Sequence, residues 1–163
     1  MLKPTRSTEI ILTHASFAIV CSQYNAEYTE SMLAAAQETL IAAGGSCEII
    51  RVAGAFEIPI AAAAVIARKT RRPVAVLCLG LIWQGETNHA EHIGEAVTRA
   101  LMEISVRTGV PCIHEVLTVQ TRKQAIKRCQ NPETNRGREA ALTALSLHQT
   151  LEGIRKGTTN PSP

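Results

Sequence analysis

The chain has 163 residues, of which 45% are hydrophobic and 19% are charged. This length fits one domain with a sizeable core, and this composition excludes a largely disordered chain. Lysine and arginine together number 17 against 14 acidic residues, so the net charge of +3 is too small to indicate a nucleic-acid-binding face.

No apolar run is long enough to cross a membrane: the longest uncharged run, residues 58–67, has about half the required length and contains a proline. The N-terminal segment carries acidic Glu9 and lacks a secretory signal pattern. We therefore expect a cytoplasmic protein with no membrane contact. The five cysteines are an odd number without CxxC spacing, which favours buried reduced thiols over disulfides or a zinc site.

Short apolar runs rich in β-branched residues alternate with segments of helical periodicity, a pattern typical of an α/β domain with a mostly parallel sheet. Four runs are predicted strands: residues 16–22, 46–53, 73–82 and 111–117. Their continuous apolarity is typical of strands covered by helices on both faces. Residues 9–12 are a candidate edge strand.

Helical periodicity predicts five helices, at residues 29–43, 58–69, 90–107, 122–129 and 136–155. In the first, Met32, Leu33, Ala36, Leu40 and Ala43 share one face. We divide the chain into an N-terminal arm (1–15), a single domain (16–155) and a tail (156–163) that we expect to be disordered.

In open α/β sheets, ligands bind beyond the carboxyl ends of the strands. In the first such loop, Tyr24 and Asn25 form either a plain turn with a tyrosine lid or a ligand contact. In the second, Ala55 and Phe56 leave room for a flat ligand, and Glu57 is either a site carboxylate or an ordinary helix-start residue.

The third loop, residues 80–92, is the most polar stretch of the chain. Gly85, Glu86 and Thr87 precede a helix, where free backbone N–H groups favour an anion such as phosphate, although Thr87 could simply be an N-cap. His89 and His92 are three residues apart, which is wrong for a metalloprotease helix. We favour proton transfer by His89 and expect no metal.

Four motifs occur in order: VAGAFEIP (52–59), LGLIWQGETNHAEHI (79–93), VLTVQTRKQAIKR (116–128) and NRGREAA (135–141). Together they resemble the 6,7-dimethyl-8-ribityllumazine synthase family of riboflavin biosynthesis, over roughly residues 16–154. The resemblance implies a flavodoxin-like α/β subunit with three layers, a four-stranded mostly parallel sheet and helices on both faces. It also implies a transferase that uses neither a metal nor an organic cofactor.

The reaction implied by this resemblance condenses 5-amino-6-(D-ribitylamino)uracil with 3,4-dihydroxy-2-butanone 4-phosphate through an imine, and releases phosphate and water. The resemblance further implies homopentamers, either alone or packed into a sixty-subunit icosahedral shell, with riboflavin synthase as a candidate enclosed partner. The active sites would lie between adjacent subunits.

Position by position, the resemblance assigns the catalytic roles to His89 and to Arg128, the phosphate-binding arginine of the neighbouring subunit. The residues that it assigns to substrate binding are Tyr24, Asn25, Ala55, Phe56, Glu57, Leu81, Ile82, Trp83, Gly85, Glu86, Thr87, His114 and Arg136. Of these, His114 and Arg136 would also come from the neighbour. His114 and Glu115 replace a common Phe-Gly, and this is the departure that we most expect to alter affinity or pH dependence.

Two alternatives remain open at this point. One is a catalytically weak paralogue that serves as a carrier or shell and binds flavin or lumazine without forming it. The other, drawn from the fold class alone, is a flavodoxin-like electron-transfer or nucleotide-binding protein. The retained His89, Arg128 and Thr87 favour the synthase.

Overall fold

The architecture comes from a computed structural model, which describes residues 13–158. Four parallel strands form one sheet in the order β2-β1-β3-β4. Their bounds are β1 (Ser16–Ser22), β2 (Ser46–Val52), β3 (Val76–Trp83) and β4 (Cys112–Val119). The candidate edge strand at residues 9–12 lies outside the described residues, as do most of the proposed arm and residues 159–163 of the proposed tail.

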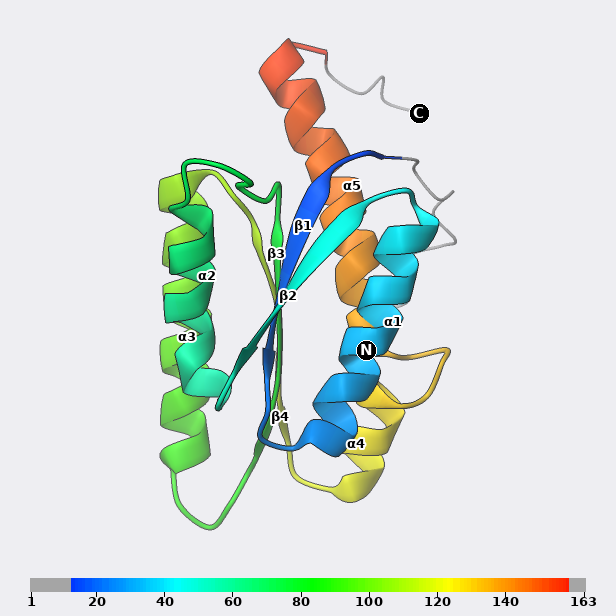
Figure 1. Cartoon of the computed structure of the whole chain (residues 1–163). Coiled ribbons are helices and arrows are strands. Elements are labelled where there is room, and N and C mark those ends of the chain that lie inside the picture. The colour runs from blue at the N-terminus through cyan, green and yellow to red at the C-terminus, as the bar shows by residue number, and fades with distance from the viewer. Residues whose placement is uncertain (1–12, 159–163) are drawn as a thin grey trace.

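Helices cover both faces of the sheet, as Figure 1 shows. One face carries α1 (Ala26–Ala42), α4 (Arg122–Cys129) and α5 (Arg136–Lys156). The other carries α2 (Ile58–Ile66), which follows a short 3₁₀ turn at Ala55–Glu57, and α3 (His89–Thr108). The predicted three-layer α/β fold with a parallel sheet is therefore confirmed.

The burial of each strand follows its place in the sheet. The central strands β1 and β3 are buried along almost their whole length, whereas the edge strand β2 has only half-buried and exposed positions and the edge strand β4 mixes buried positions with more exposed ones. One apolar core lies between the sheet and α1, α4 and α5, and a second lies between the sheet and α2 and α3. The face of the first helix predicted from periodicity belongs to the first core.

The element boundaries differ from the predictions at loops where the backbone is unusual. α1 starts three residues earlier than expected, because Asn25 adopts a left-handed conformation (φ 62°) and its carbonyl accepts bonds from the first turn. α2 ends at Ile66 rather than at residue 69, where exposed charged residues and a left-handed Arg71 (φ 55°) replace the apolar face. β3 begins after Pro73, which has no N–H to donate to the sheet.

The Asn-Arg-Gly motif starts α5. The side-chain oxygen of buried Asn135 accepts hydrogen bonds from the backbone N–H groups of Gly137 (2.8 Å) and Arg138 (3.4 Å). Its side-chain nitrogen donates to the carbonyl of Cys129, the last residue of α4. Asn135 therefore caps one helix and ties it to the end of the preceding one.

Free thiols are found at all five cysteines, of which Cys21, Cys78 and Cys129 are buried and Cys47 and Cys112 half-buried. Burial raises the pKa of the Cys21 and Cys129 thiols to about 11, so both stay protonated at neutral pH. Among residues 13–158, no helix combines the length and apolarity needed to span a membrane.

The hydroxyl of Ser22, at the end of β1, is buried and has no hydrogen-bond partner among the described residues. Because an unpaired buried hydroxyl is destabilising, we expect Ser22→Ala to raise the free energy of unfolding by about 1 kcal/mol. Urea unfolding of both proteins at equal concentration measures the change. A loss of stability would contradict this account, since it would mean that the hydroxyl is satisfied in the folded protein.

Candidate functional site

The sequence-predicted site residues of the first three loops gather at the carboxyl ends of β1, β2 and β3. Asn25 joins two of these loops. Its side-chain nitrogen donates to the carbonyl of Leu81 at 2.8 Å, and its side-chain oxygen accepts from the indole N–H of Trp83 at 3.0 Å. The Trp83 ring also meets Tyr28 edge to face, with 5.8 Å between ring centroids. Asn25 and Trp83 thus hold the rim of the site together.

Tyr24 presents an open aromatic surface at this rim, since 68% of the residue is exposed. Its backbone N–H donates to the carbonyl of Ala53 at 2.9 Å, which fastens the first loop to the second. One part of its ring lies against Gly54, where an added Cβ would come within 2.9 Å of the tyrosine Cδ2. Glycine at position 54 allows this close approach of the Tyr24 ring to the main chain of the second loop.

Glu57 and Phe56 take structural positions within this subunit. The Glu57 carboxylate accepts a hydrogen bond of 2.8 Å from the backbone N–H of Gly54, which favours the helix-start interpretation of this residue. Phe56 lies with Pro59 and Ile60 in an apolar groove of about 390 Å³ between α2 and α3. Ala55, which precedes Phe56 in the sequence, is buried.

The main chain at the end of β3 is open on one side. The last residue of β1 paired with β3 is Cys21, opposite Leu79, yet β3 continues to Trp83. On its other side β3 stays paired with β4 as far as Val119. The predicted backbone contacts of Leu81 and Ile82 with a ligand would use this open side, although the Leu81 carbonyl is already bonded to Asn25.

The loop from Gly85 to Thr87 is exposed and leads directly into the first turn of α3. The N-cap of α3 is Asn88 rather than Thr87, and the Thr87 hydroxyl accepts a long bond of 3.4 Å from the N–H of His89. A Cβ added to Gly85 would meet no atom within 4 Å. Open space around Gly85 and the exposed residues 85–89 leave the start of this twenty-residue helix accessible, and a helix start suits an anion.

His89 and His92 are both exposed on the first turn of α3. Within residues 13–158 no three histidine, cysteine or acidic side chains are arranged to hold a metal ion. An exposed imidazole next to an anion-binding helix start can exchange protons with a bound molecule.

The residues expected to come from a neighbouring subunit lie around β4, on both of its faces. His114 is turned toward α3, where its Nε2 lies 2.9 Å from the Thr98 hydroxyl, and partial burial lowers its pKa. Arg136 lies on the α5 side, with Nη1 2.8 Å from a Glu139 oxygen and 3.9 Å from a Glu115 oxygen. Burial raises the pKa of Glu115 to about 7. Arg128, the third of these residues, is exposed on α4.

The subunit therefore does not bring His114 and Arg136 together around one pocket: adjacent residues of a strand point to opposite faces, so His114 faces α3 while Glu115, the partner of Arg136, faces α5. Both faces meet at β4, which is an edge strand of the sheet within residues 13–158. A neighbouring molecule at that edge could contact both faces.

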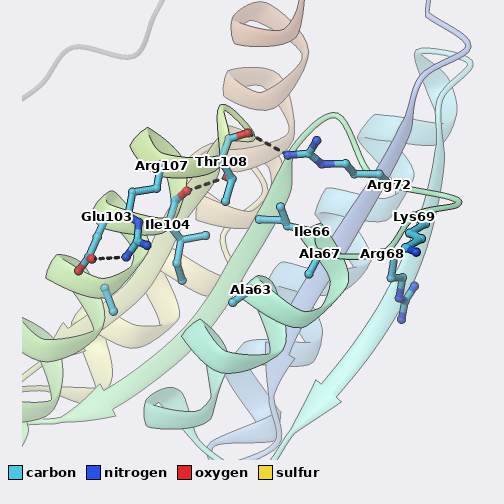
Figure 2. Close-up of a pocket in the computed structure, with 11 residues that line it drawn as sticks. Ala63, Ile66, Ala67, Arg68, Lys69, Arg72, Glu103, Ile104, Arg107 and Thr108 are labelled. Atoms are coloured by element: carbon cyan, nitrogen blue, oxygen red, sulfur yellow. Dashed lines mark hydrogen bonds and ion pairs between the residues drawn. The ribbon is translucent and has the colours of Figure 1, made fainter.

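A second cleft, larger than the groove beside Phe56, lies elsewhere, at the carboxyl ends of α2 and α3 (Figure 2). It has a volume of about 900 Å³, an apolar floor and a rim of basic side chains. Arg72 donates to the carbonyl of Thr108 at 2.9 Å, and Arg107 is paired with Glu103 at 3.0 Å. This cleft lies at the end of the domain where β3 and β4 begin, whereas Tyr24 and His89 lie beyond the carboxyl ends of the strands, so it is not the predicted site.

Sequence analysis named Glu115 but did not predict its pairing with Arg136, and it missed two contributors to the site: Gly54 as the contact of Tyr24 and Tyr28 as the contact of Trp83. The local signal for Glu115 was a carboxylate inside a predicted strand. The other two contacts join separate loops and leave no local pattern.

Comparisons with known proteins show which family the chain resembles. Residues 14–152 match the model of a family described as 6,7-dimethyl-8-ribityllumazine synthase. Proteins named 6,7-dimethyl-8-ribityllumazine synthase from Xylella fastidiosa (strain 9a5c) and Xanthomonas euvesicatoria pv. vesicatoria (strain 85-10) are each 37% identical over 143 residues. Each alignment covers 86% of this chain and 92% of the relative. A third relative of that name, from Xanthomonas oryzae pv. oryzae (strain PXO99A), is 36% identical over 141 residues, which cover 85% of this chain and 90% of the relative.

Proposed function

The chain belongs to the 6,7-dimethyl-8-ribityllumazine synthase family, and from this premise we propose how its residues carry out the reaction. The protein condenses 5-amino-6-(D-ribitylamino)uracil with 3,4-dihydroxy-2-butanone 4-phosphate to 6,7-dimethyl-8-ribityllumazine, the penultimate step of riboflavin biosynthesis. The observation that carries this conclusion is the match to the family over residues 14–152.

The pyrimidine ring would stack on Tyr24. The exposed face of this tyrosine and its contact with Gly54 favour such a role, because a fixed aromatic ring binds a flat ligand at little cost in conformational entropy. The open main chain of Leu81 and Ile82 would then contact the ring edge. In this account the hydrogen bond between Asn25 and Trp83 fixes both side chains beside the bound pyrimidine ring.

The phosphate of the second substrate would bind at the start of α3, on the N–H groups of residues 85–87. Arg128 of a neighbouring subunit would close this site with its guanidinium fork, which matches phosphate oxygens. The free space around Gly85 and the exposure of Arg128 support this arrangement. Together these groups would hold the ketone next to the amine of the first substrate.

His89 would move protons. Imine formation requires that the attacking amine lose a proton and that the departing hydroxyl gain one to leave as water. Phosphate departure requires loss of a proton from the carbon next to the one that carries the phosphate. An imidazole can supply and accept these protons, while binding supplies the alignment of the two substrates.

Replacing His89 with alanine is expected to lower kcat about tenfold without abolishing turnover, because the histidine assists a reaction that positioning already favours. Absorbance of the lumazine under steady-state conditions gives kcat and both KM values. His92→Ala is the matched control, since it removes an exposed imidazole one helical turn away, and should leave kcat unchanged. Equal kcat values for His89→Ala and wild type would remove His89 from the mechanism.

The active unit would be a homopentamer, because Arg128, His114 and Arg136 reach a site only through a neighbour. Exposed apolar side chains on α2 and α3 support self-association: Ile60 is 72% exposed, Met102 65% and Val106 76%. Both a lone pentamer and a sixty-subunit shell, with or without enclosed riboflavin synthase, fit this proposal. The five free thiols suit the reducing cytoplasm as the compartment.

The deciding experiment mixes the purified protein with both substrates and compares lumazine formation with the spontaneous rate, while light scattering on the same sample gives the oligomer mass. The proposal requires clear acceleration by an oligomer. An intact oligomer without acceleration would instead indicate a carrier or shell protein, and an active monomer would contradict the shared site.

A further inference from the structure

Glu115 is a carboxylate inside β4, turned toward α5. Only 15% of its side chain is exposed, and its Oε1 lies 3.9 Å from Nη1 of Arg136. The same Nη1 lies 2.8 Å from Oε2 of Glu139, one turn further along α5. Arg136, whose side chain is 25% exposed, is therefore shared between two carboxylates.

Four ionisable groups face Glu115 from the two helices on this side of the sheet: Arg128 and Cys129 from α4, and Arg136 and Glu139 from α5. Its neighbour on β3 is apolar Leu79. The two arginines favour the charged carboxylate, whereas burial and Glu139 oppose it. Burial has the largest effect and raises the pKa of Glu115 to about 7.

The charge of this cluster therefore changes near neutral pH. With Glu115 ionised, two carboxylates balance the two arginines. With Glu115 protonated, the arginines carry one excess positive charge, since the Cys129 thiol is neutral at this pH. An anion near Arg128 and Arg136 would repel the Glu115 carboxylate and favour its protonation.

Resting on the proposed function, we propose that Arg136 joins Arg128 at the substrate phosphate and that Glu115 is a positioning residue for Arg136: it holds Arg136 in an ion pair while the site is empty and takes up one proton when an anionic substrate engages the two arginines. The proton comes from solvent and stays on the carboxylate, and no covalent bond is made or broken at Glu115. Binding of the butanone phosphate thus becomes weaker as pH rises.

The direction of this effect follows from linkage. Below pH 7 the carboxyl is largely neutral and the arginines are available to phosphate. Above pH 7 the carboxylate competes with phosphate for Arg136, so binding must first neutralise it. The ionisation of the substrate's own phosphate acts equally on wild type and on a variant without a titratable group at residue 115.

The test is the KM for butanone phosphate in wild type divided by that in Glu115→Gln, measured across neutral pH. We expect this ratio to rise about tenfold from about pH 6 to about pH 8. Glu115→Asp keeps a titratable group and should restore the pH dependence, which a merely structural role would not predict. The KM for the uncharged uracil substrate should give a flat ratio.

Glu152→Gln is the matched control, since it removes an ion-paired carboxylate from α5 far along the helix. Its KM ratio to wild type should not change with pH. A flat ratio for Glu115→Gln with the butanone phosphate would overturn the inference.

A second measurement separates this inference from the proposed function. Sulfate is a dianion that does not titrate near neutral pH, so its binding can be followed by calorimetry in buffers of different ionisation enthalpy. Wild type should take up a fraction of a proton per sulfate bound, and Glu115→Gln should take up none. Proton uptake without acceleration of the condensation would contradict the proposed function and support the inference. Acceleration with equal proton uptake in both proteins would contradict the inference alone.

Discussion

Replacing Gly137 with alanine is expected to lower the free energy of unfolding by about 3 kcal/mol or more. Gly137 lies in the first turn of α5, where this helix packs against α1. A Cβ there would lie 1.8 Å from the carbonyl oxygen of Met32. The obstacle is main chain, so relief requires the two helices to separate and Asn135 to lose its capping geometry. Urea unfolding at matched protein concentration measures the loss.

Gly94→Ala is the matched control for this prediction. Gly94 is also helical, but its added Cβ would meet only the Thr118 hydroxyl at 3.5 Å, an ordinary contact. Alanine has the higher helix propensity, so this variant should be as stable as wild type or more stable by up to about 1 kcal/mol. Because propensity favours alanine at both positions, wild-type stability for Gly137→Ala would mean that α1 and α5 can separate without cost.

Arg128→Ala is expected to reduce kcat/KM for the butanone phosphate about 100-fold, since a charge-assisted pair of hydrogen bonds to phosphate would be lost. The same variant should leave the KM for the ribitylaminouracil nearly unchanged. Arg128→Lys should recover part of the loss, because lysine restores the charge but not the planar fork. Steady-state kinetics with each substrate varied in turn measures all three effects.

Lys127→Ala provides the control for net charge, since it removes a neighbouring exposed cation of α4. Its kcat/KM should stay within about twofold of wild type, as expected of a solvated surface charge. Equal losses in Lys127→Ala and Arg128→Ala would mean that the basic surface attracts the substrate as a whole and that Arg128 has no specific role.

Most of the fold was predictable because its signals are local. The predicted helix at residues 122–129 is α4, which starts at a capping box of Thr121 and Gln124, a pattern only four residues long. The apolar runs of β1 and β3 indicated strands buried on both faces, as they are. The errors fell at irregular loops: the start of α1 depends on the left-handed Asn25, which the periodicity of the helix does not reveal.

The candidate site was predictable as a set of residues but not as a set of contacts. Tyr24 and Asn25 were both expected at a substrate, yet only Tyr24 presents an open face, while Asn25 is bonded to Leu81 and Trp83. Phe56 likewise turned out to line the groove between α2 and α3. Whether a residue is open to a ligand or bonded within the subunit depends on where its side chain points, and this can differ between neighbours in the sequence.

The sequence by itself determined the layers, the parallel sheet and the family, because periodicity, caps and motifs are properties of short segments. Only the tertiary structure decided which distant groups meet: Gly137 with the main chain of Met32, and Glu115 with Arg136. The physical reason is that close packing and ion pairing act between atoms within a few ångströms, whatever their separation along the chain.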